Sequence, residues 1–338
     1  MGNNYWLAYK LRLKRRRLLF RALRKRNQLT PIVNRTSQIA NDDILVYSTV
    51  RNEKSRLPYF LEYYRNMGVN HFLFVDNNSN DGTLDYLKQQ RDVSLWTTKN
   101  SYKLSRFGVD WLAWLQIKYG HGHWCLVVDA DEFLVYPFCD KRPLSDLTDW
   151  LDAKNIQSFG TLMLDMYPKG QLDAHIYQPG QDPFEILNWF DAGNYRSQVQ
   201  PELQNLWIQG GVRDRVFFAD NPTRAPTLNK TPLVKWNRRF VYVSSTHSLL
   251  PRKLNNVFDE SGKKGVSGVL LHAKFLHMVV ENSREEKQRQ EHFANSTLYD
   301  AYYDSLADSP DLWREESVKY TDWQQLEHLG LLKKGMWK

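Results

Sequence analysis

Short apolar runs alternate with amphipathic segments along the first part of the chain. The apolar runs predict strands at residues 43–50, 71–75, 93–97 and 124–128. The segments between them predict helices at residues 58–67, 83–90 and 108–119. Strands and helices that alternate at this spacing are typical of an α/β fold, in which helices cover both faces of a mainly parallel sheet.

The pattern is less regular in the rest of the chain. A helix is predicted at residues 145–153, and strands are predicted at residues 159–166, 212–218, 240–245 and 269–275. Residues 168–201 are rich in Pro, Gly, Asn and Gln and predict a loop. We therefore expect three parts: a basic N-terminal arm (1–41), one principal domain (42–280) and a C-terminal helical extension (281–338) packed on it.

The formal net charge of +8 comes from the arm. Residues 1–26 hold ten basic residues and no acid, which leaves 36 basic and 38 acidic residues in the rest of the chain. Three interpretations of the arm stay open: a solvated helix or disordered tail, attachment of residues 5–26 to an anionic membrane, and nucleic-acid binding. Trp6, Tyr9 and several leucines among the charges favour the membrane over nucleic acid, for which the rest of the chain shows no matching basic patch. On a helical wheel, however, the apolar residues do not gather on one face.

Cysteine content and apolar run lengths predict the compartment. The chain has two cysteines, Cys125 and Cys139, which predict a reducing environment and no disulfide framework. No apolar run approaches the roughly 18 to 20 residues that span a bilayer, and the arm has no apolar core of a secretory signal. We expect a cytoplasmic protein, with the inner face of the plasma membrane as the place of any peripheral contact.

Three acids follow the strand predicted at residues 124–128, namely Asp129, Asp131 and Glu132. Carboxylates this close repel one another, which predicts a cation between them. In an open α/β sheet, ligands bind beyond the carboxyl ends of the strands, and polar residues follow two other predicted strands, at 51–53 and at Asp76. Hard oxygen ligands favour Mg²⁺ or Mn²⁺, which also bind substrate phosphates. The ordinary alternative is a solvated turn or a helix cap.

The residues around these acids carry a family resemblance. STVRNEKSRLPYFLEYYRNMGVNHFLFVDNNSNDGT (48–83) and WCLVVDADEF (124–133) resemble the family 2-like glycosyltransferases of the GT-A fold. The similarity is closest to the group with Arg-Asn-Glu and Asp-Asn-Asn-Ser-x-Asp-Gly-Thr motifs, and a looser similarity continues to about residue 277. It implies a three-layer α/β/α sandwich and metal-dependent transfer of a sugar, with inversion, from a nucleoside-diphosphate donor to a hydroxyl acceptor.

The resemblance also implies roles for residues at matching positions. The residues that would line the nucleotide pocket are Thr49, Arg51 and Glu53. Asp76 would accept a hydrogen bond from the base, with turn formation as its alternative. Asp129 would contact the ribose or the metal, and Asp131 would hold the metal through the diphosphate.

Further candidates come from the second part of the chain. GT-A enzymes often complete the metal site with a late histidine, for which His272 and His247 are candidates, although a core histidine is more often bound by a backbone carbonyl. Arg213 and Arg215 would share one face of the strand predicted at residues 212–218, which suits a diphosphate or an acidic acceptor. Pairing with acids of the domain is the alternative for both arginines.

The reaction also needs a general base to deprotonate the acceptor hydroxyl. Asp191 is the first candidate and Glu202 the second, although the chain lacks the Glu-Asp pair that this family usually carries.

The predicted donor is a UDP- or GDP-sugar. The predicted acceptor is a growing cell-surface glycan, such as capsule or lipopolysaccharide, or its lipid carrier. A sugar nucleotidyltransferase is one alternative, although STVRNEKSRLP lacks the glycines of a phosphate-binding loop. A non-catalytic membrane or nucleic-acid adaptor is another, and it would have no need for clustered acids at strand ends.

Overall fold

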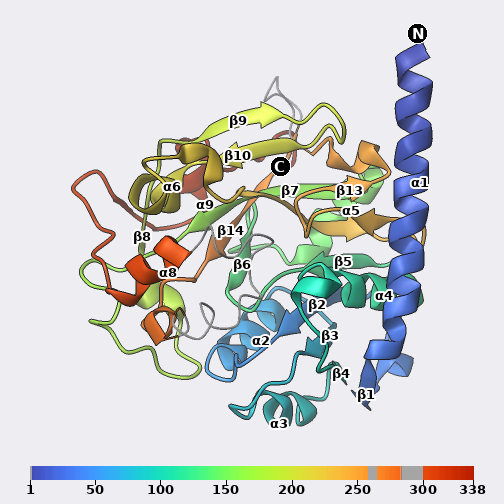
Figure 1. Cartoon of the computed structure of the whole chain (residues 1–338), viewed down its shortest axis with the longest axis horizontal. Helices are drawn as coiled ribbons and strands as arrows, with labels where there is room; N and C mark the ends of the chain where they lie inside the picture. Colours follow the sequence, from blue (N-terminus) through green and yellow to red (C-terminus); the bar gives the residue numbers. More distant parts are fainter. Residues whose placement is uncertain (1, 258–264, 282, 284–299) are drawn as a thin grey trace.

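The computed structural model describes residues 2–257, 265–281, 283 and 300–338 (Figure 1). Among these residues a nine-stranded sheet forms the centre of the molecule. From one edge to the other its strands are β1 (Thr30–Val33), β4 (Val93–Thr97), β3 (His71–Asp76), β2 (Ile44–Val50), β5 (Trp124–Val127), β11 (Asn229–Lys235), β7 (Ser158–Asp165), β14 (Gly268–His272) and β6 (Glu132–Val135).

Most strands of this sheet run in one direction. Strands β4, β3, β2 and β5 are mutually parallel. Strand β11 is antiparallel to both β5 and β7, so β7 and its parallel neighbour β14 share the direction of the first four. Only β1, β11 and β6 of the nine described strands run the other way. The predicted α/β class with a mainly parallel sheet is confirmed.

Helices cover both faces of the sheet. One face packs against α2 (Leu57–Asn66), α3 (Thr83–Lys88) and α5 (Leu144–Ala153). The other packs against α4 (Val109–Tyr119) and the short pair β12 (Val241–Tyr242) and β13 (Leu249–Leu250). Successive side chains of a strand point to opposite faces of the sheet. Val46 therefore packs on the first face, and its neighbours Leu45 and Tyr47 pack on the second.

The arm and the C-terminal part add elements around this sandwich. Helix α1 (Gly2–Lys25) lies along one edge of the molecule against α4, with its N-terminal end extending past the sheet (Figure 1). The C-terminal part contains α8 (Asp300–Ala307), β15 (Val318–Lys319) and α9 (Trp323–His328), and their apolar side chains join the core on the α2 side. The boundaries at residues 41 and 280 stay predictions, and part of the predicted extension lies outside the described residues.

Several sequence predictions differ from the structure. Residues 212–218 are not a strand, because α6 (Gly211–Phe217) occupies this segment. The segment is short, so its alternating apolar and charged residues fit the period of a strand as well as that of a helix. As a helix, it directs its charged side chains toward different partners. The predicted strand at 240–245 shortens to β12, and the predicted loop contains β8 (Trp189–Phe190) and β9 (Arg196–Val199). Strands β1, β6, β10 (Leu206–Gln209) and β11 were not predicted.

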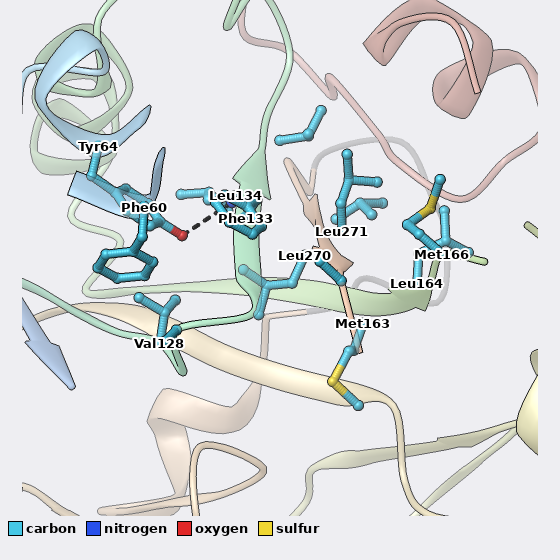
Figure 2. Packing of buried hydrophobic residues seen from close by; sticks show 14 of the residues in the cluster. Phe60, Tyr64, Val128, Phe133, Leu134, Met163, Leu164, Met166, Leu270 and Leu271 are labelled. Atoms are coloured by element: carbon cyan, nitrogen blue, oxygen red, sulfur yellow. Dashed lines mark hydrogen bonds between the residues drawn. The ribbon is translucent and has the colours of Figure 1, made fainter. Parts of the chain in front are cut away.

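The core next to β6 fixes the segment that carries the acids. Tyr64 of α2 donates a hydrogen bond to the Glu132 carbonyl (2.8 Å) and accepts one from the Leu134 amide (3.2 Å; Figure 2). Around this contact Phe60 and Phe133 pack edge to face at 6.2 Å between ring centroids. Because α2 holds the backbone directly after Asp131, the acid segment is anchored on both sides.

One glycine is required where α4 begins. Gly108 has φ +74, and a Cβ there would lie 2.6 Å from the Thr49 hydroxyl. Gly122 has a similar φ of +92 but no neighbouring atom within 4 Å of such a Cβ. We expect Gly122→Ala to lower the free energy of unfolding by about 1 to 2 kcal/mol, through backbone strain alone. Gly108→Ala should cost roughly 1 to 3 kcal/mol more, because Thr49 must also move. Urea unfolding of the two variants measures the difference, and equal losses would contradict the close approach.

Candidate active site

A cleft of about 960 Å³ lies at the carboxyl ends of the central parallel strands. Residues at the ends of β2, β3 and β5 and in the segments after them line it: Thr49, Arg51, Glu53, Asn77, Asp129 and Asp131. The second half of the sheet and its connections contribute Arg213, Lys230, His247, His272 and Lys274. The parallel strands thus bring together polar side chains that are far apart in the sequence.

Two polar atoms without partners lie in the cleft or next to a residue that lines it. The Thr49 hydroxyl and the Asp76 Oδ1 atom are buried and have no hydrogen-bond partner within the described part of the chain. Asp76 does not itself line the cleft, but its other carboxylate oxygen accepts a hydrogen bond from the Ser79 amide (3.2 Å), and the next residue, Asn77, faces the cleft. Arg51 donates to the Asn77 carbonyl (2.9 Å) and so braces the loop after β3.

The acids after β5 have a cation supplied by the chain itself. The Lys230 ammonium lies 2.7 Å from Glu132 Oε1 and 3.8 Å from Asp129 Oδ2. Glu132 Oε2 also accepts a hydrogen bond from the Asp129 amide (3.2 Å). Lys230 is buried, and burial disfavours its charge, yet the Glu132 and Asp129 carboxylates outweigh that effect and raise its pKa. The Asp129 side chain is 55% exposed, so among the acids after β5 it is the one most open to the cleft.

A second set of contacts links Asp131 to the core of the protein. The Asp131 carboxylate lies 3.2 Å from His272 Nε2, and His272 Nδ1 lies 2.6 Å from Asp165 Oδ1. The other Asp165 oxygen accepts a hydrogen bond from Arg213 Nε (2.7 Å). These four side chains form a continuous chain of charged and polar groups from the cleft inward, which we call the Asp131–Arg213 chain.

Opposite charges control ionisation in this chain. Burial alone would raise the pKa of both aspartates. Arg213 and His272 outweigh it for Asp165 and lower its pKa to about 2. His272 likewise holds the pKa of Asp131 well below its usual range. Burial disfavours the His272 imidazolium, but Asp131 and Asp165 together raise its pKa. Each charge is therefore stabilised only by its neighbours.

Asp131 and His272 fit a divalent metal as two of its ligands. In the described ranges no three His, Cys, Asp or Glu side chains group so as to hold a metal ion by themselves. Two adjacent ligands of an octahedral Mg²⁺ or Mn²⁺ lie roughly 3 Å apart, however, which matches the 3.2 Å between Asp131 Oδ2 and His272 Nε2. The other imidazole nitrogen is held by a carboxylate, as is usual for metal-binding histidines. Waters and substrate phosphates commonly supply the remaining ligands of such ions.

The other predicted metal ligands are placed differently. His247 lines the cleft, but its Nδ1 lies 2.6 Å from the Asn229 carbonyl oxygen. Burial and the nearby Lys230 lower the pKa of His247 to about 3, so its ring is neutral. Asp129 is close to Asp131 in the chain and faces the same cleft.

Neither of the two predicted general bases is among the residues that line the cleft. Asp191 is buried, and its carboxylate accepts hydrogen bonds from Arg215 (2.9 Å) and from the Tyr167 hydroxyl (2.5 Å). Glu202 is exposed and forms an ion pair with Lys14 of α1 (3.0 Å). The geometry therefore supports neither residue as the base.

The two arginines of α6 do not share a face. Helical geometry turns residues i and i+2 about 200° apart, so Arg213 reaches Asp165 beside the cleft and Arg215 reaches Asp191 outside it. Both contacts match the alternative interpretation, in which the two arginines pair with acids of the domain.

Sequence reasoning did not find Asp165, Arg56 or Lys274. Asp165 ends β7 directly beside His272 in the parallel β7–β14 pair, so a correct strand register would have placed it. Arg56 forms an ion pair with Glu53 at the start of α2 (3.0 Å). Lys274 follows His272 by two residues and lines the cleft, where burial lowers its pKa.

Comparisons with known proteins do not assign the chain to a family. No family model and no curated protein matches it. Among solved structures, one match is to a Bacillus anthracis protein assigned as a glucose-1-phosphate thymidylyltransferase, in complex with sucrose. It shares 9% sequence identity and has a TM-score of 0.30, and the alignment covers 86% of this chain and 95% of that one. With likeness this low, function has to be argued from the geometry of the chain itself.

The Asp165–Arg213 pair predicts a large effect on stability. Both side chains are buried, so Asp165→Ala would leave the Arg213 charge and the His272 ring without their partner. We expect the free energy of unfolding to fall by about 3 to 5 kcal/mol. The matched change Glu202→Ala removes an exposed ion pair and should cost at most about 1 kcal/mol. Guanidinium unfolding at neutral pH tests this, and similar losses in both variants would contradict the role of the buried pair.

Proposed function

We propose that the protein is a metal-dependent glycosyltransferase that moves a sugar from a nucleoside-diphosphate donor to a hydroxyl acceptor. The observation that carries this proposal is the pairing of Asp131 with His272 at the carboxyl end of the sheet, backed by the Asp165 carboxylate. A carboxylate and an imidazole held side by side in a cleft of this size suit a cation that also binds a diphosphate.

In this proposal the nucleoside occupies the end of the cleft near β2 and β3. The unpartnered Thr49 hydroxyl in the cleft supports this placement, because a buried polar atom without a partner is costly unless a ligand supplies one. The unpartnered Asp76 Oδ1 lies one residue before Asn77, which lines the cleft. Nucleobases carry N–H groups that suit Asp76, and UDP- and GDP-sugars are the donors that we propose. Arg51 holds in place the loop that follows Asp76.

The diphosphate would lie over Asp131 and His272. A Mn²⁺ or Mg²⁺ ion bound there offsets the negative charge of the diphosphate leaving group. Arg56 and Lys274 add positive charge at the same place, since both line the cleft and both interact with Asp131. Arg213 contributes by holding Asp165, and through it His272, in position.

The acceptor would occupy another part of the cleft, where the half-buried ring of Trp207 offers apolar surface for a sugar. Glu53 and Asp129 both line the cleft, and burial raises the pKa of Glu53, the direction that favours a general base at neutral pH. These two cleft acids therefore replace Asp191 and Glu202 as our candidates for the base.

We propose a cell-surface glycan, such as capsule or lipopolysaccharide, or its lipid carrier, as the acceptor, with the enzyme at the inner face of the plasma membrane. Within the described residues no helix has the length and apolarity needed to cross a bilayer. Contact with a membrane would then be peripheral, as the basic composition of residues 5–26 favours.

Replacing Asp131 tests the metal and the donor together. Asp131→Asn keeps the size of the side chain but weakens its hold on a divalent cation. We expect nucleotide release from a panel of UDP- and GDP-sugars with Mn²⁺ to fall about 100-fold or more, and Mn²⁺-dependent nucleotide binding to be lost. The control, Asp149→Asn, changes an exposed aspartate of α5 and should behave as wild type. Normal turnover by Asp131→Asn would refute the metal assignment.

A second assay separates the proposed activity from its alternatives. The protein is incubated with a nucleoside triphosphate, a sugar 1-phosphate and Mg²⁺, and pyrophosphate release is measured. We expect none, because the proposed reaction begins from the finished nucleotide-sugar. Pyrophosphate release would instead identify a sugar nucleotidyltransferase. Absence of any thermal stabilisation by UDP or GDP with Mn²⁺ would favour a non-catalytic adaptor.

A further inference from the structure

Helix α1 has two apolar faces, and the protein covers only one of them. Leu11 and Ala22 are buried against the domain, on the side that packs on α4 and on β12. The other side exposes large apolar residues at helical spacing. Together with Arg16 they form a row that we call the outer stripe: Trp6, Tyr9, Leu13, Arg16, Phe20 and Leu23.

The outer stripe is unusual for the surface of this protein. Twelve large apolar side chains are exposed in the described part of the chain, and six of them belong to α1. Trp6, at one end of the stripe, is 59% exposed, and Phe20, near the other end, is 60% exposed. A contiguous apolar surface of this kind marks an interaction site, whereas single exposed apolar residues do not.

Basic residues flank the stripe on both sides. Lys10, Arg12, Arg17 and Arg24 are exposed, and no acid occurs in residues 1–26. This lack of acids disfavours a second copy of the helix as the partner, because two such helices would bring like charges together. It also disfavours nucleic acid, which binds basic residues but has no use for a central row of Trp, Tyr, Leu and Phe.

We propose that the outer stripe docks the protein on the surface of an anionic phospholipid bilayer. Aromatic and leucine side chains would enter the boundary between headgroups and acyl chains, and the flanking Lys and Arg would pair with lipid phosphates. The helix is already rigidly attached for this purpose, because Arg21 donates a hydrogen bond to the fully buried carboxylate of Asp110 in α4 (2.5 Å).

The attachment of α1 also places the bilayer beside the cleft. Arg21 donates a second hydrogen bond, to the carbonyl of Leu104, whose side chain is 69% exposed. The two residues before Leu104, Tyr102 and Lys103, line the cleft. Resting on the proposed function, this arrangement favours an acceptor that is carried by a lipid, since such an acceptor would reach the cleft from the docked membrane.

Vesicle sedimentation with the full chain tests the docking surface. Wild type should sediment with vesicles of phosphatidylcholine and phosphatidylglycerol but not with phosphatidylcholine alone, and about 0.5 M NaCl should weaken the binding. Phe20→Glu should reduce the bound fraction about tenfold or more, because it places an acid in the apolar row. The matched control Ile176→Glu changes a residue of similar exposure (68%) outside α1 and should bind as wild type.

The possible outcomes separate this proposal from the enzyme activity. Phe20→Glu should still release nucleotide from a soluble donor, because Phe20 does not line the cleft. Equal binding to both vesicle types, or unchanged binding by Phe20→Glu, would overturn the membrane assignment. A lipid-free dimer in sedimentation equilibrium that Phe20→Glu dissociates would assign the stripe to a second copy, and sedimentation with RNA that is lost in Arg16→Glu/Arg17→Glu would assign it to nucleic acid.

Discussion

The buried ion pair between Asp165 and Arg213 is the constraint on which the cleft depends. It orients His272, because one Asp165 oxygen binds Arg213 and the other binds the imidazole. The β7–β14 register sets Asp165 directly beside His272, and the Ala273 amide donates to the Asp131 carbonyl (2.7 Å), which brings Asp131 to the same point. A buried charge is stable only while its partner is in place, so each of these contacts depends on the others.

Two basic side chains, Lys230 and His272, each contact a different part of the acidic cluster. Lys230 neutralises Glu132 and approaches Asp129, and His272 is bound to Asp131. The repulsion that the sequence predicts among these acids is therefore relieved largely by the protein. In the proposed function, a divalent ion would thus be needed mainly for the diphosphate rather than for folding. This separation explains how a preformed cleft can hold several carboxylates before any donor arrives.

The sequence predicted the parts of the fold that are encoded locally. The strands from β2 to β5 and the helices between them have clear periodicity, so their ends could be placed, and with them Thr49 within β2 and Glu53, Asp129 and Asp131 after the strands. The second half of the sheet is built from short strands paired over long distances, such as β11 between β5 and β7. Their partners decide their structure, so local patterns could not give the strand β11 with Lys230 or the helix α6 with Arg213.

Helix α1 is another element whose surroundings could not be predicted from its local sequence pattern. The sequence made its basic character plain, but an apolar residue on every side of the helical wheel argued against an amphipathic surface helix. The structure removes this conflict, because the side of Leu11 and Ala22 belongs to the protein core and only the outer stripe faces solvent. In the proposed docking, one apolar face of the helix binds the domain and the other binds a bilayer, so the apolar residues of the whole helix do not form a single stripe. Which residues serve which partner can be read only after the domain has been packed against the helix.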